Sequence, residues 1–159
     1  MYISYNEYAA LYGVIDERVF SRLSIDACRC LDRLTTGIDG VKKLREYFPV
    51  DEYDKQSVKH CAGRVINFLY QVHEAEQSAS MGRGYTQTPN GLQGKVVSSV
   101  ASGNESVSFS TTKAELSADI AAKDFSAKES ALRSIVKECL SSITDANGVN
   151  LLYMGRYPA

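Results

Sequence analysis

Apolar residues recur at helical spacing in three long stretches of the chain, 16–35, 54–78 and 126–143. In the first stretch they follow one another every three or four residues: Phe20, Leu23, Ala27, Leu31 and Leu34. The second stretch has the widest apolar stripe: Val58, Cys61, Ala62, Val65, Ile66, Leu69 and Val72. The third stretch repeats the pattern: Leu132, Ile135, Val136, Cys139, Leu140 and Ile143. Because an α-helix brings such positions onto one face, the pattern predicts a helical bundle with 54–78 at its centre.

Capping residues mark where these and two further helices begin. A Ser or Thr followed three residues later by Glu has the spacing of a capping box. Three pairs with this spacing open predicted helices: Ser4 with Glu7, Thr112 with Glu115, and Ser126 with Glu129. They predict a short first helix over 4–11, a weak alanine-rich helix over 112–123, and the start of the last helix. Asp16 is a good N-cap for the helix over 16–35.

The rest of the chain has no helical period. Residues 79–95 are rich in Gly, Ser, Thr, Gln and Asn and predict a flexible loop. Residues 96–110 alternate apolar and serine positions around a turn, which predicts a short β-hairpin. An Asn-Gly turn opens an apolar tail over 147–159. The expected fold is therefore mainly α: one domain, 1–159, formed by a small helical bundle with one short β-hairpin and an extended C-terminal tail.

Composition limits the classes of function. The 159 residues are 44% hydrophobic and 23% charged, with a net charge of −1, as in an ordinary soluble domain. Neither half of the chain is basic enough to steer it onto nucleic acid. The first residues have no basic leader or apolar core of a signal peptide, and no stretch reaches the about 18–20 apolar residues that span a bilayer. We therefore expect no association with a membrane.

Candidate catalytic and metal-binding groups are sparse. The two histidines, His60 and His73, lie thirteen residues apart on one predicted helix, outside any nucleophile motif. No glycine pattern matches a phosphate-binding loop. The cysteines form no C-x-x-C pair and are expected to be reduced thiols: Cys28, Cys30, Cys61 and Cys139. The chain is therefore expected to be no enzyme, with no cofactor and no metal.

Four arginines share one side of the helix over 16–35, within about 60° of arc at ~100° per residue. They are Arg18, Arg22, Arg29 and Arg33. One interpretation is a solvated face balanced by Asp26, at i,i+3 or i,i+4 spacing from two of them. The other is a subunit or partner interface, since Arg is common where charged contacts are oriented and desolvated. A DNA-contacting helix is a weaker reading because Asp26 interrupts the stripe.

The C-terminal tail also admits two interpretations. It can form a terminal strand that pairs with the predicted hairpin, or a docking peptide for a partner or neighbouring subunit. Leu, Tyr, Met and Arg are residue types that fill pockets on a partner. The candidate docking residues are Leu151, Leu152, Tyr153, Met154 and Arg156.

Four stretches, in this order along the chain, carry a resemblance to a known family. The first contains Tyr5, Tyr8, Gly13-Val14-Ile15-Asp16-Glu17, Phe20-Ser21-Arg22-Leu23, Ala27 and Leu31-Asp32-Arg33-Leu34-Thr35. The others are Val58-Lys59-His60-Cys61 with Ile66-Asn67-Phe68-Leu69-Tyr70, then residues 102–110, then residues 135–140 with 151–156. They resemble the first helices, central helix, serine-rich hairpin, and last helix and tail of tailed-bacteriophage head–tail connector proteins (adaptor or head-completion proteins). The resemblance excludes residues 82–95 and 112–125, which look like expansions.

The resemblance implies a virion structural protein made in the host bacterial cytoplasm. Its subunits would form a ring, expected to be a dodecamer, under the portal protein at the head–tail interface. The ring would extend the DNA channel and dock a neighbouring connector or tail-completion protein. Genome DNA would pass through without specific binding, which suits the near-neutral charge. The arginine stripe would then be a subunit interface, and the tail would dock on the portal or a neighbour.

Two other classes stay open. The chain could be a cytoplasmic helical adaptor or regulator that binds a single protein partner through the arginine face. A weakly DNA-binding helical module is the third possibility. A closed ring on a portal, a one-to-one complex, and a steep salt dependence of DNA binding separate the three classes.

Overall fold

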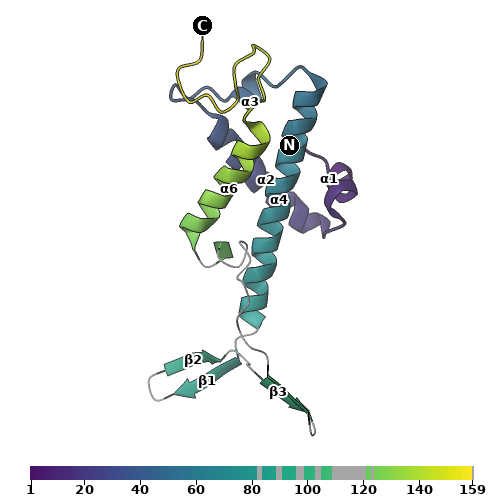
Figure 1. Ribbon diagram of the computed structural model, residues 1–159, viewed down its shortest axis with the longest axis vertical. Coiled ribbons are helices and arrows are strands. Elements are labelled where there is room, and N and C mark those ends of the chain that lie inside the picture. Colours follow the sequence, from purple (N-terminus) through teal and green to yellow (C-terminus); the bar gives the residue numbers. More distant parts are fainter. Residues whose placement is uncertain are drawn as a thin grey trace.

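The chain is mainly helical, and its helices gather around one long helix (Figure 1). We analysed a computed structural model that describes residues 1–81, 84–88, 91–95, 99–102, 105–108, 121–122 and 124–158. The helices are α1 (Tyr5–Tyr12), α2 (Glu17–Thr35), α3 (Lys43–Glu46), α4 (Glu52–Met81) and α6 (Phe125–Leu140). The predicted mainly α fold is confirmed. Among the described residues, no helix is both long and apolar enough to cross a membrane.

Helix α4 is the centre of the bundle, because α1, α2 and α6 all pack against it. Every residue of its predicted apolar stripe is buried: Val58, Cys61, Ala62, Val65, Ile66, Leu69 and Val72. Helix α2 meets this stripe with Phe20, Leu23, Ala27 and Leu31, and α6 with Leu132, Val136 and Leu140. Full burial of a Val, Leu or Ile side chain stabilises by about 1.5–3 kcal/mol, so this core carries the fold.

Two predicted helix starts are confirmed. The Ser4 hydroxyl accepts a hydrogen bond from the Glu7 backbone N–H, and the Glu7 carboxylate accepts one from the Ser4 N–H, at 2.8 Å. Asp16 caps α2 by accepting from the backbone N–H groups of Arg18 and Val19. Both devices satisfy backbone donors that the first turn leaves without a partner.

The capping box predicted for the last helix, Ser126 with Glu129, is wrong. Asp124 is the N-cap of α6, and its carboxylate accepts from the Ser126 N–H at 2.8 Å. Glu129 does not turn back toward Ser126, because its carboxylate is bound by arginines of α2 and α6. The helix predicted over 112–123 lies outside the described residues except for Ala121 and Ala122, which are helical. Asp124 has an extended backbone, so α6 begins separately from them.

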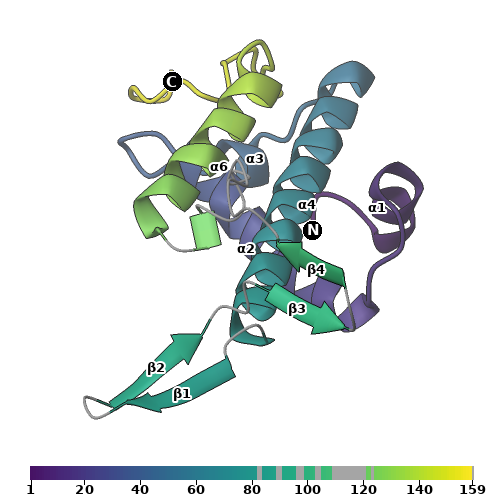
Figure 2. The ribbon, with the colours of Figure 1, turned by 60° about the horizontal axis from the view of Figure 1, so that its bottom comes forward.

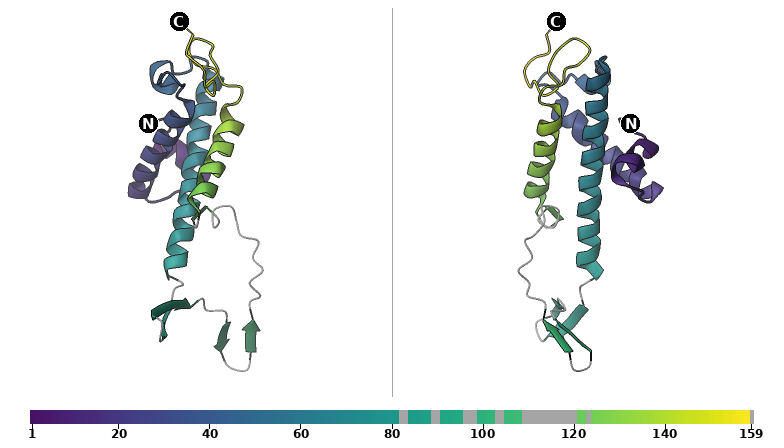
Figure 3. Two further views of the ribbon diagram at one scale, coloured as in Figure 1. Left: turned by 90° about the vertical axis from the view of Figure 1, so that its left-hand side faces the viewer. Right: turned by 45° about the vertical axis from the view of Figure 1, so that its right-hand side comes forward.

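The 79–95 segment, predicted as a flexible loop, instead contains the end of α4 and two strands, β1 (Gly84–Thr88) and β2 (Gly91–Lys95). They pair antiparallel, with Gly84 opposite Lys95. Thr and Tyr favour strands, and the glycines around them concealed that preference. Within 96–110, β3 (Ser99–Ser102) pairs antiparallel with β4 (Glu105–Ser108). Figure 2 labels all four strands, and Figure 3 shows both pairs beyond the C-terminal end of α4.

The C-terminal tail folds back onto the bundle at the end opposite the strands (Figure 3). Among the described residues, the tail therefore does not pair with β3 or β4, which was one of its two interpretations. Instead, the phenol of Tyr157 donates to the Asp145 carboxylate at 2.6 Å, and its ring stacks on Tyr47 with centroids 4.7 Å apart. The backbone N–H of Ile38 donates to the Met154 carbonyl at 3.2 Å. The tail is thus part of the folded domain.

A buried lysine of α3 holds the tail in place. The Lys43 side chain is fully buried, and its ammonium donates to the backbone carbonyls of Leu151, at 2.9 Å, and of Asn150 and Tyr153. Burial lowers the pKa of Lys43, although Asp145 and Asp39 oppose that shift. The carbonyl oxygens take the place of the water that the ammonium loses.

We predict that Lys43→Met destabilises the domain by about 1–3 kcal/mol, because it removes these charge-assisted hydrogen bonds from a buried site. Urea unfolding measures the loss, and hydrogen exchange should show faster exchange across 150–157. The matched control is Lys42→Met at the exposed neighbour, with an expected change within about 0.5 kcal/mol. Equal effects of the two substitutions would contradict the role of Lys43.

Candidate functional site

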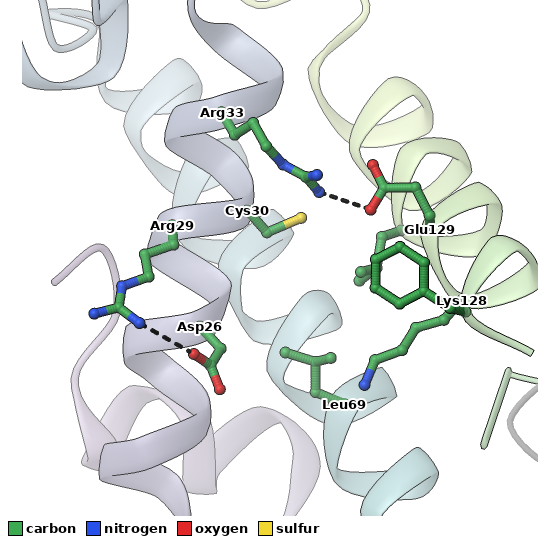
Figure 4. A pocket seen from close by; sticks show the side chains of 9 residues that line it. Asp26, Arg29, Cys30, Arg33, Leu69, Lys128 and Glu129 are labelled. Carbon is green, nitrogen blue, oxygen red and sulfur yellow. Dashed lines mark hydrogen bonds and ion pairs between the residues drawn. The ribbon is translucent and has the colours of Figure 1, made fainter. Parts of the chain in front are cut away.

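The four stripe arginines are exposed on α2, but their surroundings differ. Arg22 lies 3.3 Å from the Nε2 atom of His73 on α4. Arg29 pairs only loosely with Asp26 on its own helix, at 3.8 Å. Arg33 crosses to α6 and donates to the Glu129 carboxylate at 2.8 Å (Figure 4). Arg22, Arg29 and Arg33 therefore line the edge of the gap between α2 and α6, and Arg33 bridges that gap.

The gap forms a groove, because α2 and α6 each pack closely on α4 and touch each other only lightly. Near Arg29 the groove has a hollow of about 330 Å³, with Cys30, Leu69 and Leu132 at its base. The close-up shows Leu69 of α4 and Lys128 of α6 on the side facing α2 (Figure 4). An adjoining hollow shares Leu69 and Lys128 and reaches Arg22. The groove thus has an apolar base and a charged rim.

A second hollow, of about 400 Å³, lies between α2, α6 and the tail. We call it the cationic hollow; it is lined by Leu34, Val136, Leu152, Met154, Arg33, Arg133 and Lys137. It brings together Arg33, predicted as an interface residue, with two residues predicted for docking, Leu152 and Met154. Arg18 and Arg22 are not among its lining residues. Sequence reasoning placed the two predicted sets separately and missed that they share a surface.

The other tail residues separate by burial. Leu151 has no exposed surface and belongs to the core, so its prediction as a docking residue is corrected. Tyr153 and Met154 are 48% and 51% exposed, and Arg156 is exposed. The Leu151 side chain packs in the core, and its carbonyl accepts from the Lys43 ammonium of α3 at 2.9 Å.

The rim of the cationic hollow is positive. The Glu129 carboxylate accepts from both Arg33, at 2.8 Å, and Arg133, at 3.2 Å. The Arg33 guanidinium holds the pKa of Glu129 below its ordinary value. Lys137 adds a third positive charge to the rim, and none of the residues that line the hollow is acidic. This surface is complementary to an apolar segment that carries acidic residues.

A cysteine pair between α4 and α6 was also missed by sequence reasoning. The Arg64 guanidinium lies 3.4 Å from the Cys139 sulfur and donates to Glu138 at 3.0 Å. The hydrogen bond from the buried Cys61 thiol and the charge of Arg64 lower the pKa of Cys139. The same hydrogen bond, with burial, raises the pKa of Cys61. The signal in the sequence is Arg64 three residues after Cys61, one turn along the helix.

In the part of the chain that the structure describes, no cluster of three or more His, Cys, Asp or Glu side chains could hold a metal ion. All four cysteines are free thiols. Comparison with protein families, curated proteins and solved structures finds no match for this chain.

We predict that Arg33 and Glu129 stabilise the fold jointly by about 0.5–1 kcal/mol in a double-mutant cycle of Arg33→Gln and Glu129→Gln, measured by urea unfolding. Because the pKa of Glu129 is lowered in the folded state, the coupling is present above the ordinary Glu range and disappears as acid protonates the carboxylate. The exposed Asp26–Arg29 pair is the matched control, with coupling near zero. Equal coupling in both pairs would contradict the bridge.

We also predict that Cys139 reacts with iodoacetamide at pH 7 faster than the half-buried Cys28, since the thiolate is the nucleophile. Arg64→Gln should slow the reaction several-fold by raising the Cys139 pKa. Mass spectrometry of digested protein measures both rates. Lys137→Gln removes a charge from the same helix and should leave the rate unchanged; a rate insensitive to Arg64 would refute the assignment.

Proposed function

We propose that this chain is a head–tail connector of a tailed bacteriophage, a virion protein that forms a ring under the portal. The ordered resemblance of four stretches of its sequence to that family motivates the proposal. The observation that carries it is the cationic hollow. There a predicted interface residue, Arg33, and two predicted docking residues, Leu152 and Met154, line one open surface.

The helical bundle suits the role of a wedge in such a ring. Its core packs α2 and α6 on the apolar stripe of α4, and a close-packed interior of this kind has low compressibility. The strand pairs lie beyond the far end of α4 (Figure 3). A long helix with contact surfaces at both ends can touch two layers of an assembly, the portal on one side and the next connector or tail-completion protein on the other.

The charge of the chain fits a channel through which DNA slides. Release of counterions makes phosphate binding tight when many Lys and Arg side chains meet DNA, and tight binding would oppose passage. With 18 Lys and Arg residues against 19 Asp and Glu residues, the chain has no excess of positive charge. The proposed ring, a dodecamer, would therefore line or support the channel without binding the genome specifically.

The test is electron microscopy of particles and portal complexes of the phage that encodes the chain. We predict density for its helical bundle, repeated around the axis of the unique vertex beneath the portal. Particles made without the chain should contain packaged heads that fail to join tails. If the chain is absent from particles and purifies with a single cellular protein, it is instead an adaptor or regulator.

A further inference from the structure

The start of α4 exposes two large apolar side chains that the core does not use. Val50 is 69% exposed and Tyr53 is 75% exposed. Between them lie Asp51 and Glu52, both exposed carboxylates. We call these four residues the acidic tip. An aromatic ring beside two carboxylates on a rigid first helical turn is a compact projection, because Asp51 fixes the turn by accepting from the backbone N–H groups of Tyr53 and Asp54.

Contacts within the chain leave the acidic tip available. Glu52 pairs only with Lys55 of its own helix, at 3.5 Å, and with the amide of Gln56. Such exposed pairs contribute little and exchange readily. No aromatic contact of Tyr53 is found within the described part of the chain, in contrast to the stacked rings of Tyr47 and Tyr157. The tip therefore exposes apolar area together with negative charge.

The cationic hollow has the opposite character. Leu34, Val136, Leu152 and Met154 offer apolar contact, and the rim carries Arg33, Arg133 and Lys137. A hollow of about 400 Å³ has room for an aromatic side chain and part of its neighbours. Aromatic rings are common anchors at protein interfaces, and Met and Arg are common in the surfaces that receive them.

The two surfaces lie near the same end of the bundle and on different elements. The first turn of α4 stands beside the tail at the end opposite the strands (Figures 1 and 3). The tip consists of the first two residues of α4 and the two residues before them, whereas α2, α6 and the tail form the hollow. A contact between two different surfaces of identical chains is heterologous, and its repetition closes a ring when the rotation permits.

We propose that the acidic tip of one copy of this chain seats in the cationic hollow of the next copy. Tyr53 then packs on Leu152 and Met154, and Glu52 meets the positive rim at Lys137 and Arg133. This inference names the contact between subunits and rests on the proposed ring. It also explains why a folded domain leaves Val50 and Tyr53 in water at one place and a positive apolar hollow at another.

Charge exchange tests the contact. Glu52→Lys and Lys137→Glu should each weaken self-association of the full chain about five- to tenfold, since each places like charges together. The double variant Glu52→Lys/Lys137→Glu should return to within about threefold of the natural chain, because the opposite charges meet again. Analytical ultracentrifugation over a concentration series measures the dissociation constant of self-association for each variant. Glu74→Lys, an exposed charge reversal in the C-terminal third of α4, is the control and should change nothing.

Photocrosslinking gives a second measurement. Benzoylphenylalanine in place of Tyr53 in an isotopically labelled chain, mixed with unlabelled chain, should crosslink to unlabelled peptides that contain residues 133–137 or 152–154. Crosslinks to position 53 of the other copy, or only to other surfaces, would overturn the contact. A natural chain that stays monomeric and gives no crosslink, alone or on the portal, would overturn it too. Weaker self-association of the double variant Glu52→Lys/Lys137→Glu than of either single variant would also overturn the contact.

The outcomes for contact and function are distinguishable. If the chain forms a ring on the portal and its subunits bind one another equally well in Glu52→Lys and Lys137→Glu, the connector function stands and this contact is wrong. If self-association recovers in the double variant but the chain forms no ring on a portal, this contact stands and the connector function is wrong.

Discussion

Burial of the α4 stripe is the constraint on which the rest of the structure depends. Three helices need the same helix as their partner, and α2 and α6 take positions on it that leave a gap between them. Because α4 covers the apolar side of both helices, their outer sides stay polar and form a rim. The groove thus follows from the way in which α2 and α6 share α4, and the tail completes the cationic hollow.

Two polar contacts determine the shape of that surface. The Arg33–Glu129 bridge crosses the gap at 2.8 Å and links α2 to α6 at the edge of the hollow. The Lys43 ammonium draws three carbonyls of the tail toward α3, which brings Leu152 and Met154 to the edge of α6. The Arg33–Glu129 contact places a positive charge at the rim of the hollow. The Lys43 contacts hold the tail, which forms one wall of the hollow. A surface that binds a neighbour must be rigid before it binds, because ordering it later costs affinity.

Local patterns predicted the helices, whereas the site depended on contacts between distant residues. The period of apolar residues located α2, α4 and α6, and Ser4 and Asp16 marked two helix starts, because these signals act within a few residues. Residues 79–95 were misassigned since glycines outweighed the strand preference of their Tyr and Thr. Leu151 was misassigned because its surroundings come from distant parts of the chain; its carbonyl, for example, accepts from Lys43, 108 residues away. Arg33 and Met154 were identified separately, and only the fold brought them together.

The most direct test of the ring is the number of copies per portal, measured by native mass spectrometry of the complex that the chain forms with the portal protein of its own genome. A closed ring predicts one dominant species with a fixed multiple of the chain, expected to be a dodecamer, and no ladder of smaller complexes. A single copy of the chain bound to one cellular protein, with none on the portal, would contradict the connector function.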